Sequence, residues 1–144
     1  MAKKIKKKPE RKLRLIKKEA DSWFSLYIRL KNSDWRGYTT CYTCGHVSHY
    51  KKGMQCGHFA SRRFLNTRFD ERNTKVQCMA CNVFKRGNMN VYAEKLIAEN
   101  GADFIAEINK KANIPSKADR AWWLEKLDYY KKKVKTLDNY DCLC

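Results

Sequence analysis

The sequence predicts an α+β fold in which a small cysteine-rich module lies between an N-terminal helix and C-terminal helices. Stretches on both sides of the module place apolar residues at steps of three and four, the period of an amphipathic helix. The stretch between them carries cysteines, glycines and β-prone Tyr, Thr and Val, which is typical of short strands and tight turns. A hydrophobic content of 43% over 144 residues is enough for one packed core.

We expect four segments in chain order. Residues 1–9 form a basic flexible arm, and residues 10–37 form the N-terminal helix with a linker. Residues 38–90 form the cysteine-rich module, and residues 91–144 form a C-terminal helical extension. The apolar face of the first helix, roughly 10–31, consists of Leu13, Ile16, Ala20, Trp23, Phe24, Tyr27 and Ile28.

The C-terminal extension is expected to hold three helices. The first begins after Asn88 and stops at Asn100-Gly101, and a short one follows around Phe104. Ser116 is the candidate N-cap of the last helix. Packing of this helix on its own domain is favoured, because its apolar stripe covers only about two heptads, and a homodimer contact through 116–137 is the alternative. The stripe consists of Trp123, Leu127, Tyr130, Val134 and Leu137.

The charge predicts a polyanionic partner. Lys and Arg number 32 against 15 acidic residues, for a net charge of +17, and ten of the first eighteen residues are basic. Such a balance favours nucleic acid, because each phosphate neutralised by a basic side chain releases a counterion. No stretch is apolar enough to span a membrane, and no apolar run follows the basic N-terminus as in a secretory signal. We therefore expect DNA as partner, no membrane, and a cytoplasmic location.

Four of the seven cysteines form two C-x-x-C pairs, Cys41 with Cys44 and Cys78 with Cys81. Without secretion, cysteines are reduced thiols or metal ligands rather than disulfides. Two such pairs offer the four soft ligands that a tetrahedral structural Zn²⁺ prefers. The alternatives are unrelated buried thiols or redox dithiols, although a redox site needs only one pair. The intervening segment is longer than in a simple zinc ribbon, so we look there for chemistry.

That segment and the residues after it contain QCGHFASR at 55–62 and LNTRFDERNTKVQCMACNVFKRGNMNVY at 65–92. The order of a histidine, an asparagine and a C-x-x-C-Asn resembles HNH nucleases. The combination is similar to the phage NinG (Rap) recombination endonucleases over roughly 20–100, and the double C-x-x-C is similar to phage endonuclease VII. The resemblance implies a zinc-stabilised ββα-metal (HNH-like) module with a catalytic Mg²⁺ or Mn²⁺. It also implies cleavage of branched DNA (Holliday junctions, forks and D-loops) in the cytoplasm of a bacterial host.

Three residues carry the implied catalysis. His58 is the general base or a direct ligand of the catalytic cation; the alternative is a structural histidine. Asn82 is expected to bind the catalytic cation, because its side-chain carbonyl is a hard oxygen; the alternative is a helix N-cap. Asn73 is expected to orient the loop that carries His58. Phosphate contacts are expected from Arg62, Arg63, Lys85 and Arg86, with plain solvated charges as the alternative.

One position departs from many HNH enzymes, which have a metal-binding aspartate where this chain has Gly57. The family that it resembles also has glycine there, so the second protein ligand is unassigned, with three weak candidates: Cys56, Asp70 and Glu71. His46 and His49 are weaker zinc candidates than the four cysteines. Cys142 and Cys144 are expected to be unconstrained thiols.

Two functions compete with a structure-directed endonuclease. One is a non-catalytic zinc-knuckle protein that only grips DNA, and the other is an HNH nickase of ordinary duplex DNA. The pair of His58 and Asn82 favours an enzyme, because a pure binder has no need of an imidazole beside a hard oxygen. A protein-interaction adaptor would leave the charge of +17 unexplained.

Overall fold

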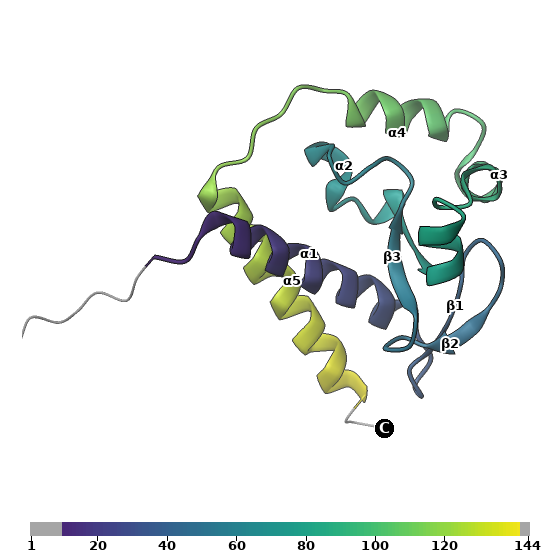
Figure 1. Ribbon diagram of the computed structural model, residues 1–144, viewed down its shortest axis with the longest axis horizontal. Coiled ribbons are helices and arrows are strands. Elements are labelled where there is room, and N and C mark those ends of the chain that lie inside the picture. The colour runs from purple at the N-terminus through teal and green to yellow at the C-terminus, as the bar shows by residue number, and fades with distance from the viewer. Residues whose placement is uncertain (1–9, 142–144) are drawn as a thin grey trace, which may run out of the picture.

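The computed structural model describes residues 10–141, with side chains described up to 137 (Figure 1). The predicted arm at 1–9 and the thiols Cys142 and Cys144 lie outside the described residues. The elements in chain order are α1 (Leu13–Lys31), β1 (Tyr38–Thr40), β2 (Val47–His49), β3 (Met54–His58), α2 (Leu65–Arg68), the 3-10 turn η1 (Glu71–Asn73), β4 (Thr74–Cys78), the π-helical segment η2 (Ala80–Phe84), α3 (Met89–Asn100), α4 (Phe104–Ala112) and α5 (Arg120–Asp141).

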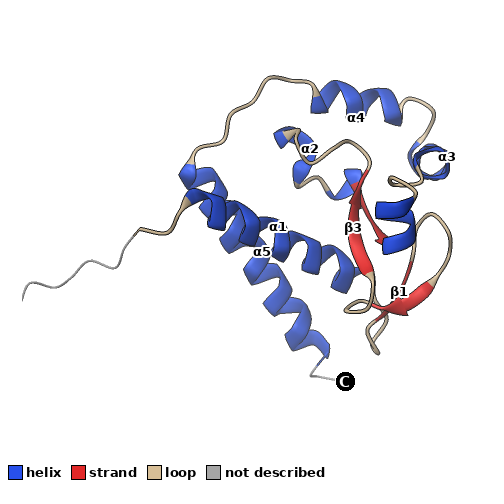
Figure 2. Cartoon of the chain, viewed as in Figure 1, coloured by secondary structure: helices blue, strands red, loops and turns tan. Residues whose placement is uncertain are grey.

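Helices flank two small sheets, so the fold is α+β as predicted (Figure 2). Each sheet is an antiparallel pair, β1 with β2 and β3 with β4. The longer ladder runs from the pair Met54 and Cys78 to the pair His58 and Thr74. The short strands expected within 38–90 are therefore present, and the second pair leads directly into η2.

Helices α1 and α5 lie side by side (Figure 1), and α1 packs against β3 and β4. The α1 residues Ile16, Ala20 and Phe24 are buried, which confirms the predicted apolar face. The stripe of α5 faces α1, with Trp123 and Val134 each 2% exposed. The stripe on which a dimer contact was based is thus used for packing within the chain.

The predicted start of the last helix was wrong. Helix α5 begins at Arg120, and Asp119 caps it: the Asp119 Oδ1 accepts the backbone N–H of Trp122 at 2.8 Å. A short carboxylate before the first turn satisfies an orphan N–H there, and Ser116 lies too early in the chain to do so. Upstream, α3 ends at Asn100 as predicted, and Gly101 follows with a φ of +100°.

A second apolar cluster joins the module to α3 and α4. Tyr92 and Leu96 of α3 are fully buried against Phe104 and Ile108 of α4. The Tyr92 hydroxyl donates to the carbonyl of Gly57 at 3.0 Å, so this core supports the strand that ends at His58. No helix among residues 10–141 is long and apolar enough to cross a membrane.

Candidate functional site

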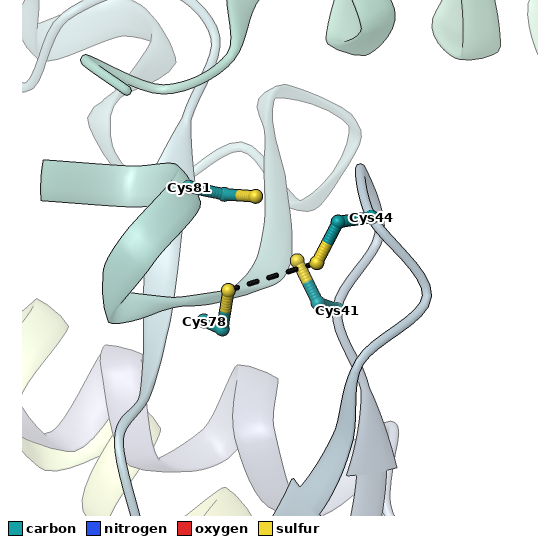
Figure 3. Close-up of side chains that lie close together, drawn as sticks. All are labelled: Cys41, Cys44, Cys78 and Cys81. Atoms are coloured by element: carbon teal, nitrogen blue, oxygen red, sulfur yellow. Dashed lines mark hydrogen bonds between the residues drawn. The ribbon is translucent and has the colours of Figure 1, made fainter. Parts of the chain in front are cut away.

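The two C-x-x-C pairs converge on one point (Figure 3). Cys41 and Cys44 lie between β1 and β2, Cys78 ends β4, and Cys81 lies in η2. Their four sulfurs all lie within 4.8 Å of one another, and those of Cys44 and Cys78 are 3.7 Å apart. Zn–S bonds of about 2.3 Å in a regular tetrahedron would place sulfurs roughly 3.8 Å apart. The cluster therefore fits a metal such as zinc.

The surroundings of Cys41 favour its thiolate, whereas the pKa values of Cys44 and Cys78 are raised above the usual value. Burial opposes the charged form of Cys41, but backbone N–H groups of Cys78, Cys44 and Thr43 and the Thr43 hydroxyl hold its pKa at about 6. Metal ligation requires the thiolate, so these donors favour the ligating form of Cys41. His49 is instead stacked on Tyr50 with ring centroids 4.7 Å apart. Neither His46 nor His49 joins the cluster.

The three predicted catalytic residues lie in or directly beside the unit of β3, β4 and η2. His58 ends β3, Asn73 directly precedes β4, and Asn82 lies in η2. His58 and Asn82 line the same cleft of about 670 Å³. Arg62 and Arg86 line it too, so the fold brings these four predicted residues together.

His58 has one nitrogen engaged and one available. Its Nε2 lies 2.8 Å from the carbonyl oxygen of Arg68. A carbonyl only accepts, so Nε2 carries the proton and Nδ1 is the basic nitrogen of the neutral ring. Burial, the largest cause, lowers the pKa of His58 below its usual value. The ring is therefore neutral near pH 7, the state in which an imidazole accepts a proton.

Asn73 is fully buried and holds the chain just beyond His58. Its Oδ1 accepts the backbone N–H of Ala60 at 2.7 Å, and its Nδ2 donates to the carbonyls of Ala60 at 2.9 Å and of Thr67 at 3.0 Å. These bonds tie the segment after β3 to the α2 region, whose Arg68 carbonyl accepts from His58. Asn73 thus binds the backbone two residues after His58 and one residue before Arg68.

Asn82 does not cap a helix. It lies inside η2, and its Nδ2 donates to the Oε1 of Gln55 at 2.7 Å. That bond sets the orientation of the amide, and Oδ1 accepts no hydrogen bond from the described residues. A free hard oxygen in the cleft is suited to a divalent cation. Gln55, which also lines the cleft, was not singled out from the sequence.

Asp21 of α1 is a cleft residue that the sequence did not reveal. Its carboxylate forms a two-pronged ion pair with the Arg68 guanidinium, with Oδ1 2.8 Å from Nε. The same guanidinium donates to the carbonyl of Arg62 at 2.7 Å and lies over the ring of Trp123. The pair fixes the residue whose carbonyl accepts from His58. Only the fold reveals this link, because 47 residues separate Asp21 from Arg68.

Replacing Asp21 with alanine should destabilise the protein by about 2–3 kcal/mol, because it strands the Arg68 charge in a mostly buried place. The two side chains are 18% and 17% exposed, so the loss should be smaller than for a fully buried pair. Urea unfolding measures it. Asp128→Ala removes the exposed pair with Lys132 and should cost under about 0.5 kcal/mol. Equal losses for the two variants would contradict the structural role of Asp21.

Gly57 leaves no room for a side chain. A Cβ atom there would clash with the Oε1 of Gln77 and would lie 2.8 Å from its Cδ. Gln77 is fully buried and held in place, since its Nε2 donates to the Thr43 Oγ1 at 3.1 Å and to the Gly87 carbonyl at 2.8 Å. Packing thus explains why this chain lacks the aspartate of many HNH enzymes.

Gly57→Ala should therefore cost about 1–3 kcal/mol of unfolding free energy through overpacking. In a Gln77→Ala background the same substitution should cost clearly less, because the clashing side chain is gone. A double-mutant cycle by urea unfolding measures this coupling. An identical cost in both backgrounds would show that Gln77 does not exclude a side chain at position 57.

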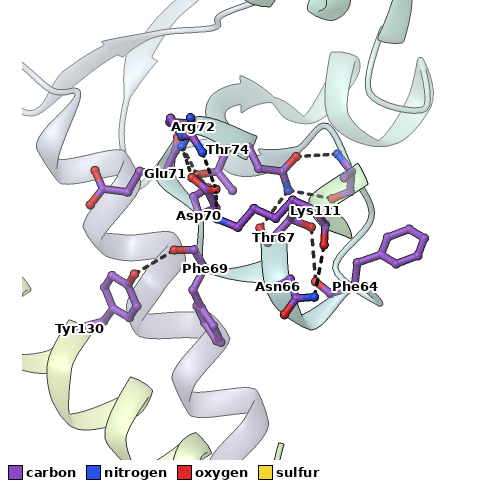
Figure 4. A network of polar contacts seen from close by, with 12 residues as sticks. Phe64, Asn66, Thr67, Phe69, Asp70, Glu71, Arg72, Thr74, Lys111 and Tyr130 are labelled. Atoms are coloured by element: carbon purple, nitrogen blue, oxygen red, sulfur yellow. Dashed lines mark hydrogen bonds and ion pairs between the residues drawn. The ribbon is translucent and has the colours of Figure 1, made fainter. Parts of the chain in front are cut away.

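Of the three candidates for a second cation ligand, one lines the cleft and two do not. Asp70 accepts from Lys111 Nζ at 2.6 Å and caps η1 (Figure 4). Glu71 accepts from the Tyr27 hydroxyl at 3.1 Å, and neither carboxylate lines the cleft. Cys56 does line the cleft, but burial raises its pKa to about 12, so it is a neutral thiol. Among the described residues, the four cysteines are the only group of three or more His, Cys, Asp or Glu that could hold a metal.

Two predicted phosphate-binding residues lie outside the cleft lining. The Arg63 guanidinium lies over the ring of Phe64, 4.6 Å from its centroid. Lys85 is exposed at the end of η2. The fold therefore divides the four predicted basic residues into two that line the cleft, Arg62 and Arg86, and two that do not.

The fold and the cysteine cluster define a class: a small α+β protein with a four-cysteine site suited to a structural metal. Residues 1–140 match the family described as Bacteriophage Lambda NinG protein, and the chain belongs to this NinG family.

Curated relatives agree with this assignment. Protein ninG of Escherichia phage 933W is 29% identical over 127 residues, which cover 85% of this chain and 58% of the relative. Protein ninG of Escherichia phage lambda is 28% identical over 127 residues, 85% of this chain and 57% of the relative. Protein ninG of Salmonella phage P22 is 32% identical over 92 residues, which cover 63% of this chain and 42% of the relative. The chain thus spans somewhat over half the length of the first two relatives. No solved structure matches it significantly.

Proposed function

We propose that this chain is a metal-dependent DNA endonuclease that hydrolyses phosphodiester bonds in branched DNA, acting on phage DNA in the host cytoplasm. The observation that carries the proposal is the shared cleft of His58 and Asn82. A neutral imidazole and a free amide oxygen come together there, on a hairpin and a helical segment. The resemblance of this arrangement to HNH nucleases supports the same conclusion.

The cleft residues suit the steps of phosphodiester hydrolysis. Water attacks phosphorus more readily when a base removes its proton, and His58 Nδ1 is suited to accept that proton. Asn82 Oδ1 would help to hold Mg²⁺ or Mn²⁺, which would supply charge stabilisation at the phosphate. Arg62 and Arg86 would bind the phosphates on either side of the scissile bond. Asn73 and the pair of Asp21 and Arg68 would keep the imidazole in position.

The four-cysteine cluster supports the site mechanically. Cys78 is the last residue of β4 and Cys81 lies next to Asn82, so a bound zinc would join both to the turn of Cys41 and Cys44. A catalytic site needs its groups held to within about half an ångström, and small modules rarely achieve this through packing alone. We assign the zinc a structural role and the cleft cation a catalytic one.

A non-catalytic zinc protein that only binds DNA is the second candidate, and the net charge of +17 suits it equally well. The cleft argues against it. Binding alone does not require a buried imidazole with one free nitrogen, nor an amide whose nitrogen is occupied while its oxygen is free.

Incision of three end-labelled DNAs, a four-way junction, a fork and a linear duplex of the same sequence, tests the proposal. We expect cuts in the junction and the fork and an intact duplex. Nicks in all three would instead indicate an HNH nickase of ordinary duplex DNA. Binding of all three without a cut would favour the non-catalytic zinc protein.

A further inference from the structure

The cleft of His58 continues into a second depression along α1. This depression, of about 360 Å³, shares Asp21, Ser25 and Arg62 with the cleft. Its remaining lining residues are Lys18, Ser22 and Arg29. One continuous groove therefore leads from the histidine along the polar side of the helix.

The α1 residues of this groove form a stripe. Lys18, Ser22, Ser25 and Arg29 follow steps of four, three and four, so they lie on one side of the helix. The eleven helical steps from Lys18 to Arg29 extend roughly 16 Å. Successive phosphates of one DNA strand advance about 3.4 Å along a duplex axis, so the groove is long enough for several.

The groove carries positive charge that the chain does not neutralise. Among the described residues, none of Lys18, Arg29 and Arg62 forms an ion pair. Arg29 donates only to backbone carbonyls, to Ser25 at 3.2 Å and to Tyr50 at 2.8 Å, which orients its guanidinium and leaves the charge intact. The one acid of the lining, Asp21, already pairs with Arg68.

We propose that this groove is a phosphate track, in which Lys18, Arg29 and Arg62 bind backbone phosphates along the strand that passes His58. Ser25 is a further donor to phosphate oxygens, whereas the Ser22 hydroxyl donates to the Lys18 carbonyl at 2.9 Å. The inference rests on the proposed DNA substrate and adds where the strand runs: along α1, an element outside the β3–β4–η2 unit. The contacts are to the backbone, so the track positions a strand without reading its sequence.

The salt dependence of binding tests the track. In a non-cleaving His58→Ala background, the affinity for a labelled four-way junction is measured over a series of salt concentrations. The slope of log K against log[salt] is negative, and each lost phosphate contact reduces its magnitude by about 1. Lys18→Gln and Arg62→Gln should each reduce this magnitude by about 1, and the double variant by about 2. Lys110→Gln, an exposed lysine of α4, changes the net charge equally and should leave the slope unchanged.

The outcomes separate the track from the nuclease. Slopes for Lys18→Gln that match those for Lys110→Gln would overturn the track, even if the unmodified protein cuts the junction. Slopes of reduced magnitude in both track variants would support the track, even if the unmodified protein never cuts DNA. A circular dichroism spectrum for each variant checks that the fold is retained.

Discussion

Cys78→Ser should abolish zinc binding and unfold the module. A hydroxyl is a poor zinc ligand, and structural zinc contributes on the order of 10 kcal/mol to the folding of small zinc domains. The β3–β4 hairpin ends at this residue, and its sulfur lies 3.7 Å from that of Cys44, so removing it opens the cluster. Zinc content by mass spectrometry and thermal unfolding followed by circular dichroism measure the effect.

Cys56→Ser is the matched control. Cys56 lies in the partner strand β3 but outside the four-sulfur cluster, so this variant should retain one zinc per chain. A Cys78→Ser protein that is free of zinc and melts at the temperature of the unmodified protein would refute a structural metal at this cluster.

His58→Ala should reduce junction cleavage by about 10²–10⁴-fold, the usual contribution of a general base, while DNA binding remains. The ring lines the cleft but is not among the basic groups that would bind phosphate. Single-turnover cleavage and a binding isotherm on the same DNA separate the two effects.

Two further variants sharpen this prediction. In His58→Gln the amide can still donate to the Arg68 carbonyl but cannot act as a base, so it should be as inactive as the alanine variant. His49→Ala changes a histidine outside the cleft, stacked on Tyr50, and should cut at the normal rate. Full activity in His58→Gln would assign this histidine a structural role.

The helices were predictable because their apolar residues recur at the spacing of an amphipathic helix. Ile16, Ala20 and Phe24 recur at helical spacing and are all buried, and Asn100-Gly101 ends α3. The start of α5 was not predictable, because Ser116 and Asp119 are both good caps and the sequence alone does not choose between them. In the structure Asp119 caps the helix, and the buried Trp123 lies in its first turn.

The site was predictable only where its spacing is local. Two C-x-x-C pairs indicate a cluster, and the order of His58, Asn73 and Asn82 resembles a known module. Asp21 and the groove along α1 could not be foreseen, because they depend on the packing of α1 against β3. The sequence alone likewise does not explain why position 57 is a glycine. In the fold, the buried amide of Gln77 fills the space that a side chain at this position would need.

The metal dependence of incision tests the central claim most directly. The protein, loaded with one zinc and freed of other divalent ions, is incubated with a labelled four-way junction before and after Mg²⁺ or Mn²⁺ is added. We expect an intact junction without the added ion, incision near the branch point with it, and one zinc retained throughout. A junction that is bound but never cut, at any concentration of either ion, would rule out a metal-dependent endonuclease.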